Sequence, residues 1–304
     1  MRSFFSRAKV ILLGEYAVLH GADALCLPLK TGQHLNVENN SQALIHWKWS
    51  YKHKVLADFT LEPETLELNS TAAGNPQWAV SLIKLIRNQQ PGFLKTNPRN
   101  LHFINYFPPE WGLGSSSATI SALCRLADAN PYLVNQKLMG GSGADIACAT
   151  AHSWVLYRNH LPEPPRWELP FDYALKEYTY FIYSGKKQAT AEHLENVRSG
   201  KKPSHAEWDK LNHYVYRFLG ISNVIDAVDL LQTHEDFIAQ RIGMQPLANS
   251  FPDFPGAIKS LGAWGGDFFM ALSNQPAGFV KDYFIHKGYP VVFTWEELVE
   301  NQAF

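Results

Sequence analysis

The chain is poor in cysteine and has no excess of either charge. Cys26, Cys124 and Cys148 are its only cysteines, and an odd number without a close pair argues against a disulfide framework or a zinc site. Lys and Arg total 27 against 28 Asp and Glu, which gives a formal net charge of −1. Proteins that bind nucleic acid or an anionic membrane usually need an excess of basic over acidic residues. We therefore expect neither as a partner.

Long hydrophobic runs are also missing. No uncharged apolar run approaches the ~20 residues that a membrane-spanning helix needs. The short apolar stretch near the start is interrupted or bounded by Lys9, Glu15 and His20, and no small-residue cleavage site follows, so we predict no signal peptide. With 46% hydrophobic and 18% charged residues, the composition is that of a globular chain. We expect a soluble, reduced, cytoplasmic protein.

The length of 304 residues predicts two domains, because single cores rarely grow to this size. Pro162, Pro164 and Pro165 mark the best boundary, since closely spaced prolines stop helices and stiffen a connection. The expected domains are residues 1–165 and 166–304. The sequence has no internal repeat and no low-complexity segment.

Short segments rich in β-branched or aromatic residues predict strands, and apolar residues at helical spacing predict helices. The strands expected in the first half are 8–13, 24–28, 33–38, 43–51, 54–60 and 101–107, and the helices are 76–88 and 115–129. The second half is expected to contain strands 178–183, 258–261, 268–272 and 290–294, and helices 190–198, 205–219 and 224–241. Strands and helices are therefore mixed in both halves.

The strongest local signal is the segment Pro108 to Ala118, PPEWGLGSSSA, which follows an expected strand and opens an expected helix. Gly112 and Gly114 allow positive φ and a close approach of the backbone to a ligand. Three serines then occupy the first helical turn, where backbone N–H groups are free and the helix dipole is positive. This combination predicts a phosphate site, and a serine hydroxyl there can bind Mg²⁺. The alternative is a capped helix after a tight turn.

Two further glycine-rich stretches can approach a ligand closely. In the first, GGSGADIA, Asp145 is either a helix N-cap or a carboxylate that orients or deprotonates a substrate hydroxyl. In the second, Ser260 to Asp267, the glycines form either a wall of the site or a hairpin turn. The loop after residue 108 is neither a Walker A loop, since no Gly-Lys-Ser/Thr follows, nor a dinucleotide fingerprint, since the third glycine is missing.

Together with the segment Lys9 to Gly21, KVILLGEYAVLHG, these stretches resemble the GHMP kinase superfamily, which includes galactokinase, homoserine kinase, mevalonate kinase and phosphomevalonate kinase. Lys9 to Gly21 resembles the first motif, and Pro108 to Ala118 matches the fixed positions of the second. Gly141 to Ala147 resembles the segment that carries the catalytic aspartate. Leu261 to Asp267 resembles the third motif, with Trp264 at a position that is normally glycine. The Gly-Glu-Tyr form of the first motif is closest to phosphomevalonate kinase.

The resemblance implies an α+β fold of two domains. The first would be a ribosomal-protein-like α/β domain that binds ATP, and the second a ferredoxin-like α/β sandwich. The implied activity is transfer of the γ-phosphoryl group of ATP, with Mg²⁺, to a hydroxyl or phosphate group of a small molecule similar to mevalonate or phosphomevalonate. A catalytically silent ATP and metabolite sensor is the alternative. The oligomeric state is left open.

The resemblance also implies roles for individual residues. Asp145 would accept or orient the proton of the acceptor, and Lys9 would stabilise negative charge beside it. ATP would be bound by the second motif, with Ser116 as the Mg²⁺ ligand: Pro108, Gly112, Leu113, Gly114, Ser115, Ser116 and Ser117. The residues implied at the acceptor or cleft wall are Glu15, Tyr16, Gly143, Gly262, Gly265 and Gly266. Lys186 and Lys187 are either a solvated loop or a contact for an anionic acceptor.

Overall fold

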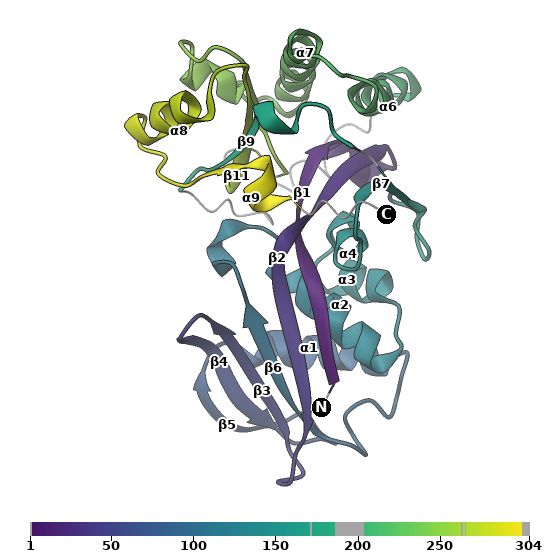
Figure 1. Cartoon of the computed structure of the whole chain (residues 1–304). Helices are drawn as coiled ribbons and strands as arrows, with labels where there is room; N and C mark the ends of the chain where they lie inside the picture. The colour runs from purple at the N-terminus through teal and green to yellow at the C-terminus, as the bar shows by residue number, and fades with distance from the viewer. Residues whose placement is uncertain (1, 171, 186–203, 263, 265, 300–304) are drawn as a thin grey trace.

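A computed structural model describes residues 2–170, 172–185, 204–262, 264 and 266–299 of the chain. Two β-sheets, of eight and four strands, form its framework. The larger sheet extends through the lower part of Figure 1, and the smaller one lies above it beside helices α6 to α9. The fold is therefore mixed α+β, as the sequence predicted, and it is built on two sheets.

The larger sheet has the strand order β5-β4-β3-β6-β2-β7-β8, with β1 paired to β2. Only the β3–β6 pair within it is parallel. Its strands are β1 (Arg2–Leu13), β2 (Asp23–Asn39), β3 (Ile45–Tyr51), β4 (Lys54–Leu61), β5 (Leu68–Ala73), β6 (Arg99–Asn105), β7 (Trp154–Arg158) and β8 (Arg166–Leu169).

Strand β2 corrects one detail of the sequence analysis, which expected two strands at 24–28 and 33–38. The chain stays extended between them, and β1 pairs along both parts. On its other side β2 changes partner, from β7 at Asp23–Cys26 to β6 at Gln33–Asn39. Strand β8 pairs with β7, so the larger sheet continues past residue 165, where the domain junction was expected.

Four helices accompany the larger sheet: α1 (Pro76–Arg87), α2 (Ser115–Ala127), α3 (Pro131–Leu138) and α4 (Ala144–Cys148). Helix α1 begins as its sequence predicts, because the Asn75 side chain accepts a hydrogen bond from the Gln77 N–H and Pro76 occupies the first turn. Its buried face, which includes Leu82 and Ile86, packs in one core with residues of α2 and of strands β3, β4 and β6.

The second half of the chain builds the smaller sheet in the order β10-β11-β9-β12, with every neighbouring pair antiparallel. Its strands are β9 (Thr179–Tyr183), β10 (Ala257–Ser260), β11 (Phe268–Leu272) and β12 (Val292–Thr294). The helices are α6 (His205–Leu219), α7 (Val224–Ile242), α8 (Ala277–His286) and α9 (Trp295–Leu298). Short 3₁₀ helices are η1 (Ala17–His20), η2 (Pro109–Trp111), η3 (Lys176–Tyr178) and η4 (Leu247–Ser250).

One hydrophobic core joins the two halves. Strands β1 and β2 contribute residues such as Leu12 and Leu27, and these share a buried cluster with Phe181 of β9, Phe218 of α6 and Trp295 of α9. The expected helix at 190–198 lies outside the described residues. Within the described part of the chain, no helix combines the length and apolarity that crossing a membrane requires.

Candidate functional site

The loop before α2 has the geometry that the sequence predicted. Gly112 and Gly114 have φ of 67° and 92°, in the left-handed region that glycine tolerates. Helix α2 begins at Ser115 directly after Gly114, and none of the described side chains caps it by a hydrogen bond. Gly114 occupies the N-cap position, so this geometry fits both the predicted phosphate site and the alternative of a capped helix after a tight turn. The free N–H groups of the first turn can receive an anion.

Lys9 connects this loop with the other candidate catalytic residue. Its backbone N–H donates a hydrogen bond to the carbonyl oxygen of Leu113 at 3.1 Å, which fixes β1 beside the loop. Its Nζ atom lies 3.4 Å from Oδ1 of Asp145, and the two side chains are 11% and 31% exposed. Burial opposes the charged ammonium, but the carboxylates of Asp145 and Asp267 outweigh it and raise the pKa of Lys9 above its usual 10.5. Lys9 is therefore a cation at neutral pH.

Asp145 lies in the first turn of α4 but is not its N-cap, because Gly143 occupies that position with φ of 89°. A Cβ atom on Gly143 would lie 2.7 Å from the Tyr157 hydroxyl oxygen and 3.0 Å from the Tyr132 ring. Gly143 therefore lets the turn pack between two tyrosines. The Asp145 carboxylate faces Lys9 instead of the backbone.

The third glycine-rich stretch, Ser260 to Asp267, contributes the residues of the site that come from the second half of the chain; it is called the third turn below. A small cavity of about 30 Å³ is lined by Lys9, Val10, Ile11, Gly112, Leu113, Leu261, Gly262, Asp267 and Phe268. A Cβ atom on Gly112 would lie 2.0 Å from Oδ2 of Asp267, so this carboxylate packs directly against the loop that contains Gly112 and Gly114. Asp267 was not among the predicted site residues, although it directly follows the glycines of the third stretch.

Glu15 and Tyr16 are the residues that the resemblance places at the acceptor or cleft wall. Both are buried, and neither lines the cavity with Lys9. The Glu15 carboxylate is bound by Lys259, and the Tyr16 hydroxyl accepts a hydrogen bond from the Trp264 N–H at 2.8 Å. The Trp264 ring, at a position that is normally glycine in the third motif, is 1% exposed and packs in a core with Tyr16. The physical reason is that Lys259 supplies a buried counter-charge, which draws Glu15 inward.

The remaining predicted residues divide into three groups. Pro108 precedes η2, and its carbonyl oxygen accepts a hydrogen bond from the Trp111 N–H at 3.0 Å. Leu113 and Gly266 are buried, as is Ser117. Gly265, Lys186 and Lys187 lie outside the residues that the structure describes.

An aromatic pocket beside the start of α2 was not predicted from the sequence. It has a volume of about 260 Å³ and is lined by Trp47, Trp49, Leu56, Ala57, Phe59, Asn75, Trp78, Ala79, Ser116 and Thr119. Trp47 is buried, whereas Trp49 is only partly buried, and both line this pocket. The alternating tryptophans of β3 are visible in the sequence, but nothing in the sequence predicted that α2 would share a pocket with them.

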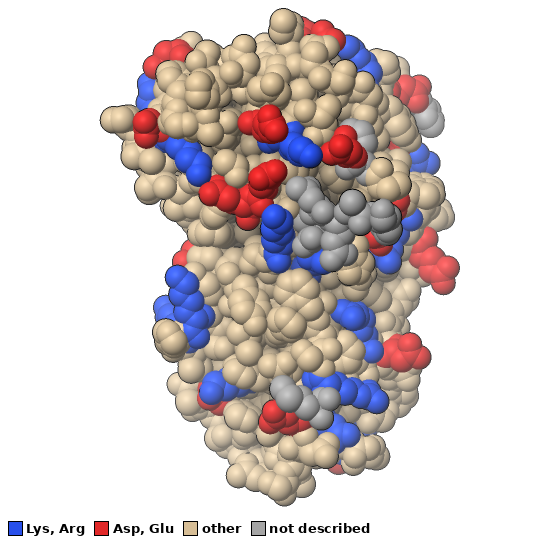
Figure 2. All heavy atoms as spheres, in the orientation of Figure 1, with Lys and Arg blue, Asp and Glu red and all other residues tan. Residues whose placement is uncertain are grey.

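Trp111 holds the loop between the two halves. Its ring lies 5.7 Å from the ring of Tyr183, and 5.6 Å from those of Phe268 and Phe293, all on the smaller sheet. In Figure 2 the visible surface narrows between the halves, and basic and acidic side chains are interspersed without a continuous basic stripe.

The described side chains form no group of three or more His, Cys, Asp or Glu residues able to share a metal ion. Tightly caged metals are bound by such groups, whereas Mg²⁺ in phosphoryl transfer keeps waters and is held by one or two protein oxygens and the substrate phosphates. The partly buried Ser116, at the open start of α2, fits the second arrangement.

No protein-family model and no curated protein matches the chain in sequence. Solved structures do match it. The chain is similar to Streptococcus pneumoniae phosphomevalonate kinase in complex with phosphomevalonate and AMPPNP, with 15% identity over 97% of this chain and 100% of that one, and a TM-score of 0.70. Mevalonate kinase of Methanococcus jannaschii matches with 18% identity, 96% of each chain and a TM-score of 0.65.

Lactococcus lactis galactokinase, solved with galactose, matches with 12% identity over 99% of this chain and 93% of that one, and a TM-score of 0.70. These three kinases act in different reactions but share one architecture, and the match covers nearly the whole chain. The chain therefore has the fold of the GHMP kinases, which the resemblance of its motifs predicted.

Proposed function

We propose that the protein is an ATP-dependent kinase that transfers the γ-phosphoryl group to a small-molecule acceptor. The observation that carries the proposal is the approach of the Lys9 ammonium to the Asp145 carboxylate beside the uncapped start of α2. A cation, a carboxylate and free N–H donors at one place are what phosphoryl transfer asks of a protein, since catalysis there is mainly positioning and charge neutralisation.

ATP would bind across the loop and the aromatic pocket. The pocket shares Ser116 with the start of α2, so one ligand can occupy both. Its volume of about 260 Å³ is close to the roughly 300 Å³ at which ligand pockets begin. Trp49 and Trp78 provide aromatic surfaces for the adenine ring. The phosphates would then meet the N–H groups of α2, and the Ser116 hydroxyl would bind Mg²⁺.

The acceptor would enter beside Asp145. The carboxylate would orient the acceptor hydroxyl and take its proton as the phosphoryl group arrives, or orient a phosphate acceptor. The Lys9 ammonium would offset the negative charge that builds up on the transferred group. Mg²⁺, when bound, would neutralise charge on the β- and γ-phosphates of ATP.

For the acceptor class we favour compounds similar to mevalonate or phosphomevalonate. The support is the Gly-Glu-Tyr form at Gly14 to Tyr16 and the sequence Gly141 to Ala147, together with a structural neighbour that binds phosphomevalonate. We also propose that the first half is a ribosomal-protein-like domain and that the protein is cytoplasmic. For the second half we propose a ferredoxin-like sandwich, because its strands follow the order β-α-β-β-α-β along the chain.

The test is an ATP-consumption screen with mevalonate, phosphomevalonate, homoserine and sugars as acceptors. We expect one acceptor to give a single product that carries one new phosphate. The Asp145→Ala variant should bind nucleotide with nearly wild-type affinity but turn over about 10²- to 10⁴-fold more slowly, since it loses the group that handles the proton.

Wild-type turnover by Asp145→Ala would contradict the role of that carboxylate. Tight ATP binding by the wild-type chain, with no acceptor phosphorylated, would instead favour the sensor alternative. Absence of nucleotide binding would overturn the proposal as a whole.

A further inference from the structure

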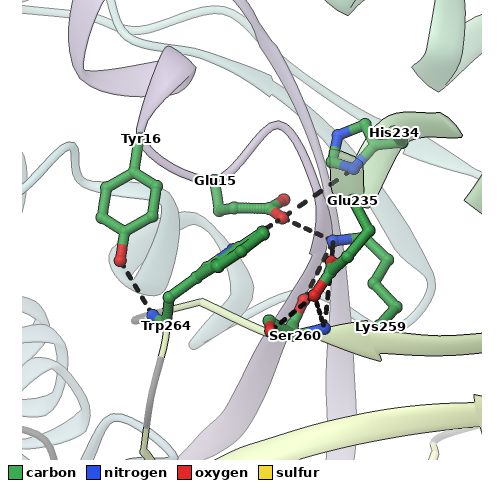
Figure 3. Close-up of polar contacts among 7 residues, drawn as sticks. All are labelled: Glu15, Tyr16, His234, Glu235, Lys259, Ser260 and Trp264. Carbon is green, nitrogen blue, oxygen red and sulfur yellow. Dashed lines mark hydrogen bonds and ion pairs between the residues drawn. The ribbon is translucent and has the colours of Figure 1, made fainter. Parts of the chain in front are cut away.

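A buried polar network lies behind the site, and its members come from four separate segments. Figure 3 shows Glu15 and Tyr16 from the turn after β1, His234 and Glu235 from α7, Lys259 and Ser260 from β10, and Trp264 from the third glycine-rich turn. The side chains of Glu15 and Lys259 are 1% and 0% exposed. Charged groups are almost never buried this completely unless they are paired.

The network is held together by Lys259. Its ammonium donates to Glu15 Oε1 and, at 2.9 Å, to the Ser260 carbonyl oxygen, and it lies 3.8 Å from Oε2 of Glu235. The Glu235 carboxylate in turn accepts hydrogen bonds from the Ser260 N–H at 3.0 Å and from the Ser260 hydroxyl at 2.7 Å. His234 lies 4.0 Å from Glu15 and stays neutral, because burial and the nearby Lys259 charge lower its pKa well below the usual value.

Two segments of this network continue along the chain into the candidate active site. Glu15 follows β1, the strand that carries Lys9. Ser260 is followed directly by Leu261 and Gly262, which line the small cavity with Lys9 and Asp267. The Glu15–Lys259 ion pair therefore joins the lysine strand to the start of the third turn.

Trp264 makes a second connection between the same two segments. Its backbone N–H donates to the Tyr16 hydroxyl at 2.8 Å, and its indole N–H lies 3.5 Å from Oε1 of Glu15. The ring is buried with Tyr16, Ala17 and Ile238 among its apolar neighbours. At a position where the resembling motif has glycine, this chain has an anchor that is fixed in the core.

We propose that the buried Glu15–Lys259 pair, with Trp264, is a positioning device that holds the third turn so that the Asp267 carboxylate faces Lys9. Glu15 and Lys259 are positioning residues, since neither lines the cavity. The inference rests on the proposed function for its kinetic consequences, whereas the geometry of Lys9 and Asp267 can be tested without any turnover.

The closing experiment compares Glu15→Gln/Lys259→Met with Asp267→Asn. The double variant is used because Lys259→Met alone leaves Glu15 as a buried charge without a partner, which endangers folding. Glu235 also loses the nearby lysine but keeps its hydrogen bonds from the Ser260 N–H and hydroxyl. Its fold is checked by circular dichroism. Lys281→Met is the matched control, because it breaks an exposed lysine–glutamate pair of 3.3 Å, between Lys281 and Glu297, in the same half of the chain.

The first readout is the pKa of the Lys9 ammonium, measured by lysine side-chain ¹⁵N NMR and assigned with Lys9→Arg. Asp267→Asn should lower this pKa, because the Asp267 carboxylate raises it. Removing Glu15 and Lys259 takes away one negative and one positive charge that are paired with each other. A similar fall in the double variant would therefore come from displacement of Asp267, while Lys281→Met should change nothing.

The second readout is turnover. Each of the two variants should lower kcat about 10-fold or more with nucleotide affinity changed less than about 3-fold, because misplacing a group by about 1 Å can cost 10²-fold. Combining Glu15→Gln, Lys259→Met and Asp267→Asn in one chain should lower kcat little further than either variant does alone. The reason is that the double variant and Asp267→Asn both act through Asp267. If the double variant folds and leaves the Lys9 pKa unchanged while Asp267→Asn lowers it, the positioning role is wrong. A wild-type chain without turnover would refute only the proposed function.

Discussion

Gly112→Ala tests the contact between the loop before α2, which contains Gly112 and Gly114, and the third turn. Gly112 has φ of 67°, and a Cβ atom at this position would lie 2.0 Å from Oδ2 and 2.5 Å from Oδ1 of Asp267. Nonbonded atoms cannot remain that close, so either the Asp267 carboxylate or the backbone of the loop must move. The carboxylate is the end of a side chain and moves more easily than the backbone of the loop.

Two costs of different kind follow from this geometry. The left-handed backbone costs alanine about 1–2 kcal/mol relative to glycine, which lowers the free energy of unfolding by that amount. At roughly 2–4 °C per kcal/mol for a large domain, the melting temperature should fall by several degrees. Displacement of Asp267 costs little stability but removes it from Lys9, so kcat should fall about 10- to 100-fold.

Two controls separate these costs. Gly243, at the end of α7, has φ of 70° and nothing within 4 Å of an added Cβ atom, so Gly243→Ala should lose similar stability and keep full activity. Gly141→Ala should change neither, because its Cβ atom would meet only Asn135 Nδ2 at 3.8 Å. The assays are urea denaturation and steady-state kinetics on all three variants. Wild-type kcat in Gly112→Ala, or an equal loss in Gly243→Ala, would refute the reasoning.

Three further predictions concern the nucleotide and Lys9. Ser116→Ala should raise the Mg²⁺ concentration needed for half-maximal activity, and an unchanged Mg²⁺ titration would exclude its hydroxyl from the metal site. Trp78→Ala should weaken ATP binding about 5- to 100-fold through loss of a stacking surface (about 1–3 kcal/mol), as measured by calorimetry, and should weaken inorganic triphosphate binding little. The pKa of Lys9 is raised in the folded protein, so its pairing stabilises the fold below pH 10.5 and is lost as pH rises through the raised pKa. The difference in unfolding free energy between wild type and Asp145→Asn, about 1 kcal/mol, should be constant from neutral pH to about pH 10 and shrink above it.

Local sequence signals were sufficient for the elements that carry their own caps, periods and turns. Helix α6 was predicted at its observed bounds, and α1 and α7 to within one residue, because their apolar residues recur at helical spacing. The loop from Gly112 to Ser117 was likewise readable, since glycine and serine have specific conformational and hydrogen-bonding properties there.

Long-range pairing could not be read in the same way. Strands β5 and β7 to β8 were not predicted, because their sequences are short and acquire their conformation from neighbours in the sheet. The burial of Glu15 depends on Lys259, which is 244 residues away in the sequence. The role of Asp267 likewise depends on a contact with a distant residue, Gly112. The pocket that contains Trp49 and Trp78 also depends on contacts that local sequence does not specify.

The shared core has a consequence for how the molecule can be divided. Residues of β1 and β2 such as Leu12 and Leu27 are buried by Phe181, Phe218 and Trp295 from the second half. A fragment that ends at residue 165 would leave this surface exposed to water and would lack β8, so it should aggregate instead of folding. The whole chain should accordingly melt in a single cooperative transition, and neither half is a module that could be transplanted alone.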